Sequence, residues 1–124
     1  MSNFKVMDLR PFLPAKDFEV SKAFYVALGC TLKWDGPDLL LFELGEHRFY
    51  LGRTYNKDYA EKTRLHITVE DTQSWFDHVS ALVKNDPRFA TVRVQAPRQE
   101  SYGALVTFVH DPCGILLDFA QRTG

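Results

Sequence analysis

Two amphipathic helices are predicted by apolar residues that recur every three or four positions. The first stripe consists of Val20, Phe24 and Leu28, and the second of Trp75, Val79, Leu82 and Val83. Each stripe follows an aspartate, Asp17 or Asp71, whose carboxylate can accept hydrogen bonds from the free N–H groups of a helix start. The first helix is expected to end at Gly29 and the second at 85–87, where a proline follows.

Segments typical of strands surround both helices. Short extended runs precede the helices, and further strands are predicted at 30–35, 38–44, 47–52, 90–96, 103–110 and 115–120. Each half therefore has the order β-α-β-β-β, and the two halves align at an offset of 54 residues, with Asp17 on Asp71. We expect one α+β domain over 1–124, with module 1 at about 5–52, a polar linker at about 53–63 and module 2 at about 64–121.

Alternation along the strands assigns each side chain to one of two faces. Leu9 and Leu13 share a parity, as do Leu65, Ile67 and Val69, and these apolar sets are expected to face the core. The side chains of opposite parity, from four strands, are Arg10, Phe12, Arg48, Tyr50, Arg64, His66, Leu116 and Asp118. Aromatic side chains mixed with a few charges are typical of a small-molecule pocket. A solvated sheet face with Asp118 paired to an arginine fits the same pattern.

Composition narrows the functional classes. The 15 basic and 16 acidic residues give a net charge of −1, which provides no electrostatic footprint for nucleic acid. No apolar run is long enough for a membrane helix and no signal pattern begins the chain, so a cytoplasmic protein is expected. Cys30 and Cys113 are far apart in the sequence and are expected to be reduced, partly buried thiols.

Four stretches together resemble the vicinal oxygen chelate superfamily, which includes glyoxalase I, bleomycin-resistance proteins and extradiol dioxygenases. They are the first strand with its acidic helix cap (Arg10 to Asp17), the "FY…LG" helix (Ser21 to Gly29), the second-module strand and helix (Leu65 to Trp75), and the closing hairpin around Asp111-Pro112-Cys113-Gly114 (Val106 to Phe119). The resemblance implies two tandem βαβββ modules that form a curved mixed sheet lining a cavity.

Metal-dependent members of that superfamily place His or Glu at one position in each of four strands. The equivalent positions here are Arg10, Tyr50, Arg64 and Asp118. Because a guanidinium has no lone pair to offer a metal ion, the usual metal centre is expected to be absent, and we expect no cofactor. A shifted metal site would have to use His66 and Asp118, with His47 or His110.

The resemblance is strongest to the bleomycin-resistance branch, and it implies a metal-free homodimer that binds a small molecule in grooves at the subunit interface. The arginines favour a small anionic ligand, because a guanidinium pairs well with carboxylate or phosphate. Replacing Arg64 by alanine is expected to weaken such a ligand while leaving the fold intact. The candidate ligand-binding residues are Arg10, Phe12, Trp34, Arg48, Tyr50, Arg64, His66, Tyr102 and Asp118.

The sequence leaves open whether the protein is an enzyme. One alternative is a metal-dependent lyase, isomerase or dioxygenase with a shifted ligand set around His66 and Asp118. Another is a metal-free enzyme in which one of these two residues is a general base and arginines stabilise an oxyanion.

Overall fold

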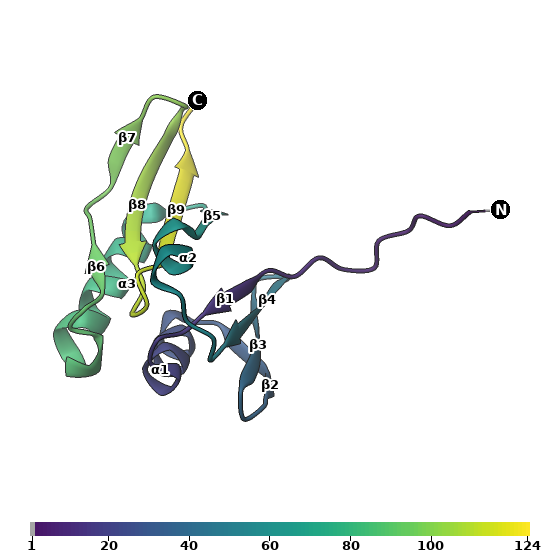
Figure 1. The fold of residues 1–124 in the computed structure, drawn as a ribbon. Coiled ribbons are helices and arrows are strands. Elements are labelled where there is room, and N and C mark those ends of the chain that lie inside the picture. The colour runs from purple at the N-terminus through teal and green to yellow at the C-terminus, as the bar shows by residue number, and fades with distance from the viewer. Residues whose placement is uncertain (1) are drawn as a thin grey trace.

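Two sheets, each associated with a helix, form the body of the protein (Figure 1). The computed structural model describes residues 2–124. Sheet A contains β1 (Phe12–Pro14), β2 (Thr31–Asp35), β3 (Leu39–Leu44) and β4 (His47–Gly52) in the spatial order β1-β4-β3-β2, with α1 (Phe18–Leu28) after β1. Sheet B contains β5 (Arg64–Thr68), β6 (Arg93–Val94), β7 (Arg98–Glu100), β8 (Ala104–His110) and β9 (Leu116–Arg122), with α3 (Thr72–Asn85) after β5. Its order is β5-β9-β8-β6, and β7 also pairs with β8. The predicted α+β fold with two repeated modules is confirmed.

The two modules are equivalent at the level of strand pairing. The first strand of each sheet lies parallel to the last, β1 to β4 and β5 to β9, and the other pairings are antiparallel. Phe12 lies opposite Tyr50 in sheet A, and His66 lies opposite Asp118 in sheet B. Phe12 and His66 are also 54 residues apart, so the sequence repeat and the structural repeat have the same offset.

Helix ends follow the capping residues. The side chain of Asp17 accepts a hydrogen bond from the Val20 N–H at 3.2 Å, and that of Asp71 accepts one from the Ser74 N–H at 3.3 Å. Gly29 ends α1 with a φ of 118°, and α3 ends at Asn85. These boundaries confirm the predicted starts and ends of both helices.

The core lies between the helices and the sheets. Phe24, Tyr25 and Phe42 are fully buried in it, and Trp75 of α3 stacks on Phe119 of β9 with ring centroids 4.5 Å apart. Side chains of this size each stabilise the folded state by roughly 1.5–3 kcal/mol when buried. Cys30 and Cys113 are buried and free, as predicted.

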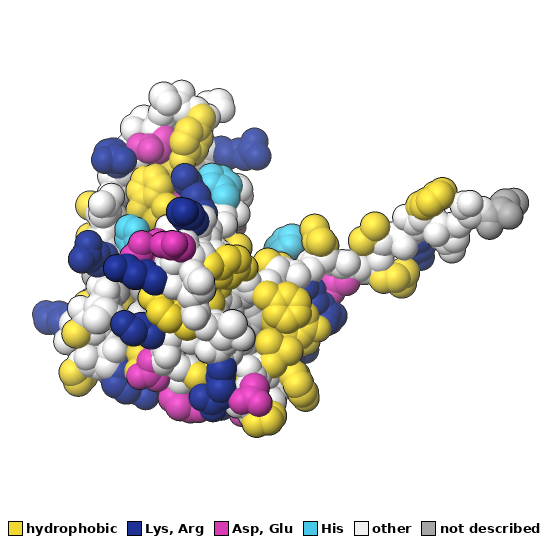
Figure 2. All heavy atoms as spheres, viewed as in Figure 1, with side chains coloured by type: hydrophobic (Ala, Val, Ile, Leu, Met, Phe, Trp, Pro, Cys, Tyr) yellow, Lys and Arg dark blue, Asp and Glu magenta, His cyan; other side chains and the backbone are white. Residues whose placement is uncertain are grey.

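The N-terminal segment differs from the prediction. β1 begins at Phe12, and Leu9, expected on the core face, is 86% exposed. Residues 2–9 form an extended, exposed arm that projects from the body, and Figure 2 shows hydrophobic side chains along it. A strand needs a neighbour for its hydrogen bonds, and among residues 2–14 the pairing with β4 covers Phe12–Pro14, with one further hydrogen bond from the Tyr50 N–H to the Pro11 carbonyl at 2.9 Å.

Two further segments differ in detail. The predicted linker contains a short helix, α2 (Lys57–Lys62), which Asn56 caps by accepting a hydrogen bond from the Tyr59 N–H at 3.1 Å. Six residues are too few to produce an apolar stripe in the sequence, so periodicity did not reveal this helix. The strand expected over 90–96 is reduced to β6 (Arg93–Val94), because residues 90–91 form a turn that follows a 3-10 turn, η1 (Pro87–Phe89). Within residues 2–124, no helix is long and apolar enough to cross a membrane.

Candidate functional site

An aromatic row crosses the face of sheet A that points away from the core. Pairing in register places Trp34 opposite Leu41, Leu41 opposite Tyr50, and Tyr50 opposite Phe12. Directly paired residues share a face, so these four side chains lie together. Phe12 stacks on Tyr50 with ring centroids 4.6 Å apart and is 57% exposed, and Trp34 is 53% exposed. We call Phe12, Trp34, Leu41 and Tyr50 the aromatic half-site.

The aromatic half-site continues into a groove of about 830 Å³ at the end of sheet A. Phe12, Leu39 and Gly52 line it from the strands, and Asn56 and Tyr59 line it from the region of α2. The Tyr59 hydroxyl donates a hydrogen bond to the Phe12 carbonyl at 3.0 Å, which fixes α2 against β1. Tyr59 was not among the predicted site residues, because its segment was interpreted as a linker.

The two arginines beside the aromatic row are each paired with a carboxylate. Arg10 donates from Nη1 to the Tyr50 hydroxyl at 2.8 Å and from Nε to Asp8 at 2.6 Å. The hydrogen bond with Asp8 raises the pKa of Arg10 and lowers the pKa of Asp8. Arg48 donates to Glu43 at 2.9 Å. The predicted basic residues of sheet A therefore carry little unbalanced positive charge.

A buried carboxylate lies at the equivalent position of sheet B. Asp118 is fully buried, and its Oδ2 accepts hydrogen bonds from Arg64 Nε at 2.7 Å and Nη2 at 2.6 Å. His66 Nδ1 lies 3.2 Å from the same oxygen. Asp118 raises the pKa of Arg64 through this hydrogen bond. Asp118 Oδ1 is buried and has no hydrogen-bond partner among residues 2–124.

The side chains around Asp118 reach a small hollow. Tyr102, 56% exposed in the turn between β7 and β8, has its ring centroid 6.4 Å from that of His66. Both residues line a hollow of about 190 Å³ together with Arg122. Arg122 was not predicted as a site residue, although its position four residues after Asp118 in β9 places both on one face. We call Arg64, His66, Tyr102 and Asp118 the charged half-site.

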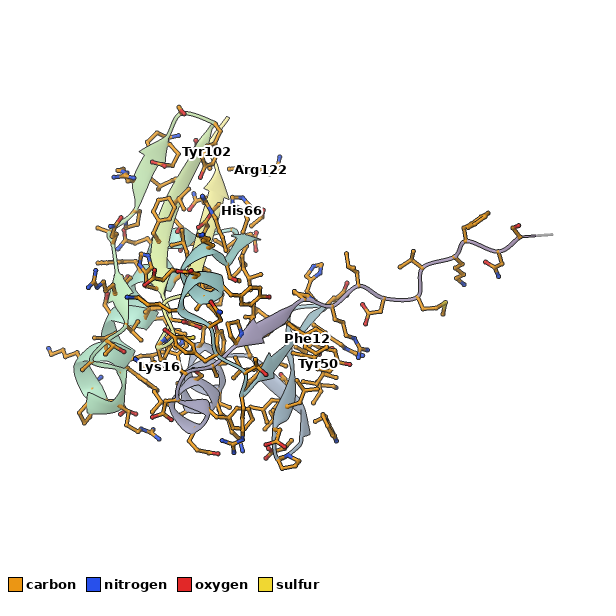
Figure 3. The ribbon with its side chains drawn as sticks, viewed as in Figure 1. Phe12, Lys16, Tyr50, His66, Tyr102 and Arg122 are labelled. Carbon is orange, nitrogen blue, oxygen red and sulfur yellow. The ribbon has the colours of Figure 1, made fainter. Side chains whose placement is uncertain are left out.

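One chain holds the two half-sites apart. Figure 3 shows Phe12 and Tyr50 on sheet A and, well separated from them, His66, Tyr102 and Arg122 on sheet B. The predicted residues thus fall into a sheet A group and a sheet B group. The former contains Arg10, Phe12, Trp34, Arg48 and Tyr50, and the latter contains Arg64, His66, Tyr102 and Asp118.

A third concavity, an apolar cleft of about 600 Å³, lies between the modules. Leu65, Ile67, Val69 and Trp75 line it from module 2, and Phe49 lines it from module 1. The parity prediction for β5 is confirmed, since Leu65 and Ile67 are partly buried against the core while Arg64 and His66 are exposed. The cleft itself was not predicted, because these apolar side chains were expected to be covered by the core.

The superfamily's metal positions do not fit a metal ion in this chain. Arg10 and Arg64 offer no lone pair to a metal ion. Asp118 is the one of the four residues that commonly ligates metals, and its Oδ2 already accepts a hydrogen bond from Arg64. No group of three or more His, Cys, Asp or Glu side chains that could hold a metal occurs in the described part of the chain. His66 is therefore near one carboxylate but lacks the further donors that a shifted site would need.

Comparisons with known proteins agree with this architecture. A bleomycin resistance determinant encoded on transposon Tn5 is 19% identical, with a TM-score of 0.77 over 94% of this chain and 98% of that chain. The bleomycin-binding protein of Streptomyces verticillus, complexed with copper(II)-bleomycin, is 22% identical, with a TM-score of 0.76 over 98% of this chain and 99% of that chain. TnmS3, an antibiotic binding protein from Streptomyces sp. CB03234, is 18% identical, with a TM-score of 0.76 over 98% of this chain and 100% of that chain.

These likenesses establish a shared fold. A search of curated proteins finds no match to this chain. The family model described as Glyoxalase/Bleomycin resistance protein/Dioxygenase superfamily matches residues 8–119, which is nearly the whole chain. The chain therefore belongs to the glyoxalase, bleomycin resistance protein and dioxygenase superfamily.

Proposed function

We propose that this protein is a metal-free binding protein that, as a homodimer, holds a small planar organic ligand carrying one anionic group. The observation that carries this proposal is the aromatic half-site. Phe12 and Trp34 are both more than half exposed on one sheet face, and Phe12 is held by stacking on Tyr50. Exposed aromatic side chains fixed by a sheet present a large rigid contact area at low cost in entropy.

The charges around the half-sites favour a ligand with a single anionic group. Arg10 and Arg48 are each paired with a carboxylate, so they add little attraction for a second anion. Arg64 is 52% exposed and uses only Nε and Nη2 to bind Asp118, which leaves Nη1 for a ligand. Arg122 lines the adjacent hollow and adds a further positive charge. A bulky cationic drug would meet these guanidinium groups without a matching negative surface.

The comparisons support ligand binding in general. Solved relatives are described as bleomycin-binding and antibiotic binding proteins, and these descriptions concern those proteins. This chain shares their fold and places exposed aromatic side chains on a sheet face. Sequestration of a small molecule is therefore the simplest function for a site with no fitted metal donors.

A homodimer would bring the two half-sites together. Within one chain they lie on separate sheets, yet they are structurally equivalent, with Phe12 and Tyr50 matching His66 and Asp118. A two-fold axis between copies can place the aromatic half-site of one next to the charged half-site of the other. Each of the two resulting cavities would then contain stacking surface and one cationic region.

The test is a binding series with three probes of the same ring size: 1-naphthoate, 1-naphthamide and a 1-naphthylmethylammonium salt. Binding is measured by calorimetry and by the emission of Trp34, with Trp34→Phe identifying that signal. We expect 1-naphthoate to bind most tightly and Phe12→Leu to weaken it by about tenfold, as loss of an aromatic contact predicts. Tyr55→Leu, an exposed aromatic position outside the row, is the control. Equal affinity of Phe12→Leu and wild type for 1-naphthoate, or no saturable binding, would refute the proposal.

A second candidate function rests on the contact between His66 and Asp118. A histidine that donates its Nδ1 proton to a buried carboxylate leaves Nε2 free to accept a proton, which is the arrangement of a general base. Turnover of α-dicarbonyl or hydroxyacid substrates would favour a metal-free enzyme with His66 as general base if chelators leave the activity intact and His66→Gln abolishes it. If no substrate of these two classes is converted, ligand binding remains the proposed function.

A further inference from the structure

We infer that Gly52 determines which ligands fit, because its missing side chain lets a flat ring system run from the aromatic half-site into the groove at the end of sheet A. The ligand class that follows is an acid built on linearly fused rings, longer than naphthalene, with its anionic group outside the groove. This inference rests on the proposed binding of a planar ligand at the aromatic half-site, and it adds the length of that ligand. It does not depend on the homodimer.

The outward face of sheet A is arranged in rows, with the aromatic half-site as the middle row. On one side of it, Glu43 and Arg48 are paired in register and form an ion pair at 2.9 Å. On the other side, Gly52 is paired with Leu39 and with Pro14. Neighbouring rows are two residues apart along each strand, which is about 6.7 Å. A planar ligand on the aromatic row therefore has a polar row at one end and a low, apolar row at the other.

Gly52 leaves open space at the floor of the groove. It is the last residue of β4, and its carbonyl accepts a hydrogen bond from the Ala15 N–H at 2.9 Å. A Cβ added to Gly52 would lie 3.6 Å from Leu39 Cδ1 and 4.0 Å from the Asp38 carbonyl oxygen, which are ordinary van der Waals distances. A side chain would therefore fit at this position and would occupy the groove.

The backbone does not require glycine at position 52. Gly29 and Gly45 have positive φ values, whereas Gly52 does not, so an L-residue could adopt its conformation. Glycine in a paired strand weakens the strand, and it often marks a place where a ligand comes close to the backbone. Since neither the φ value nor a close neighbour requires glycine, the consequence of Gly52 is the space above it.

The groove suits the neutral end of such a ligand. Its volume of about 830 Å³ lies in the range of roughly 300–1,000 Å³ that is typical of small-molecule pockets. Pro14, Leu39 and Tyr59 contribute apolar surface to its lining. Asp38 and Arg53, which also line it, form an ion pair with each other at 3.0 Å. Because these two charges compensate each other, the groove offers little attraction to an anionic group.

Phe12 connects the aromatic half-site to the groove. Its ring stacks on Tyr50, and the two side chains lie side by side in Figure 3. Phe12 also lines the groove, where its carbonyl accepts the hydrogen bond from the Tyr59 hydroxyl. One continuous apolar surface therefore runs from Tyr50 past Phe12 to Gly52. A naphthalene can cover the aromatic row, but a longer ring system is needed to reach the row of Gly52 as well.

The experiment measures by calorimetry the affinities of 2-naphthoate and 2-anthroate, which differ by one linearly fused ring. Wild type should bind 2-anthroate about tenfold more tightly, because the additional ring is buried in the groove. Gly52→Val should remove this preference and change the affinity for 2-naphthoate by less than about twofold, with Gly52→Ala between the two. The melting temperature of Gly52→Val should be unchanged or higher, since valine favours strands. Thr31→Val, which adds an exposed valine to β2 outside the groove, is the control.

The other results would overturn the inference, and they separate it from the proposed function. Equal affinities of wild type for the two acids, or a preference for 2-anthroate that survives Gly52→Val, would mean that the ligand does not enter the groove, while the proposed binding at the half-site would stand. Weaker binding of both acids together with a lower melting temperature of Gly52→Val would assign Gly52 a structural role. No saturable binding of either acid to wild type would refute both the inference and the proposed function.

Discussion

Single positions determine how the two equivalent half-sites differ. Tyr50 and Asp118 each lie opposite the first strand of their sheet. Each accepts a hydrogen bond from an arginine, Tyr50 from Arg10 and Asp118 from Arg64, and these two arginines are 54 residues apart. Alternation along the strands predicted the face of each side chain. An ion pair between Asp118 and an arginine was one of the alternatives, and Arg64 forms it, but the full burial of this carboxylate was not predicted. Arg64→Ala would leave that carboxylate poorly compensated, so it is expected to reduce stability as well as binding and cannot separate the two.

The buried pair of Tyr25 and Asp111 supports a prediction about stability. The Tyr25 hydroxyl donates to Asp111 Oδ2 at 2.5 Å, and burial raises the pKa of Tyr25 well above its ordinary value. Tyr25→Phe removes this donor and should lower the free energy of unfolding at neutral pH by about 2 kcal/mol. Tyr55→Phe, at an exposed position, should have little effect.

The pair of Tyr25 and Asp111 also predicts how its contribution to the free energy of unfolding changes with pH. Because the pKa of Tyr25 is raised in the folded state, its contribution is fully present below about pH 10 and is lost at higher pH, where the unfolded phenol ionises first. The difference in free energy of unfolding between wild type and Tyr25→Phe should therefore narrow above about pH 10, as measured by urea denaturation. A difference that stays constant through that range would contradict this assignment.

At the scale of elements, segments with a clear period were predicted and segments without one were not. α1, α3, β3, β4, β8 and β9 combine apolar periodicity with capping or turn residues, and each lies where it was expected. α2 is too short to display a period. The arm has the composition of a strand, but a strand forms only where another strand can pair with it, and residues 2–124 provide no such partner for the arm.

The end of α1 provides a prediction for one element. Gly29 has a φ of 118°, and a Cβ added there would meet nothing within 4 Å, so the cost of a side chain is backbone strain alone. Gly29→Ala should lower the free energy of unfolding by about 1–3 kcal/mol, with an unchanged denaturant slope. Gly45→Asn is the control, because Gly45 has a φ of 61°, which asparagine tolerates. Equal stability of Gly29→Ala and wild type would contradict the assigned cap.

At the scale of the whole molecule, the repeat explains what the sequence could say about the arrangement of the candidate residues and what it could not. The offset of 54 residues identified equivalent strands, and alternation then identified their outward faces. Neither the offset nor the alternation gives the distance between the two sheets. Seven of the nine candidate residues could therefore be selected from alternation, and Trp34 and Tyr102 were added as aromatic side chains. The division of the candidates into two half-sites required the arrangement of the modules in space.

That arrangement leads to a prediction about metal binding. The four positions that the superfamily uses for a metal are divided between the sheets, Arg10 and Tyr50 on one and Arg64 and Asp118 on the other. A dimer that joined the sheets would still assemble two guanidinium groups, one phenol and one carboxylate, and the guanidinium groups would repel a cation. We expect purified wild-type protein to bind no stoichiometric nickel, zinc, iron or manganese in native mass spectrometry, even after titration. His66→Ala is the informative variant, because a stoichiometric ion present in wild type and lost in His66→Ala would establish a shifted metal site and favour lyase or dioxygenase chemistry over simple binding.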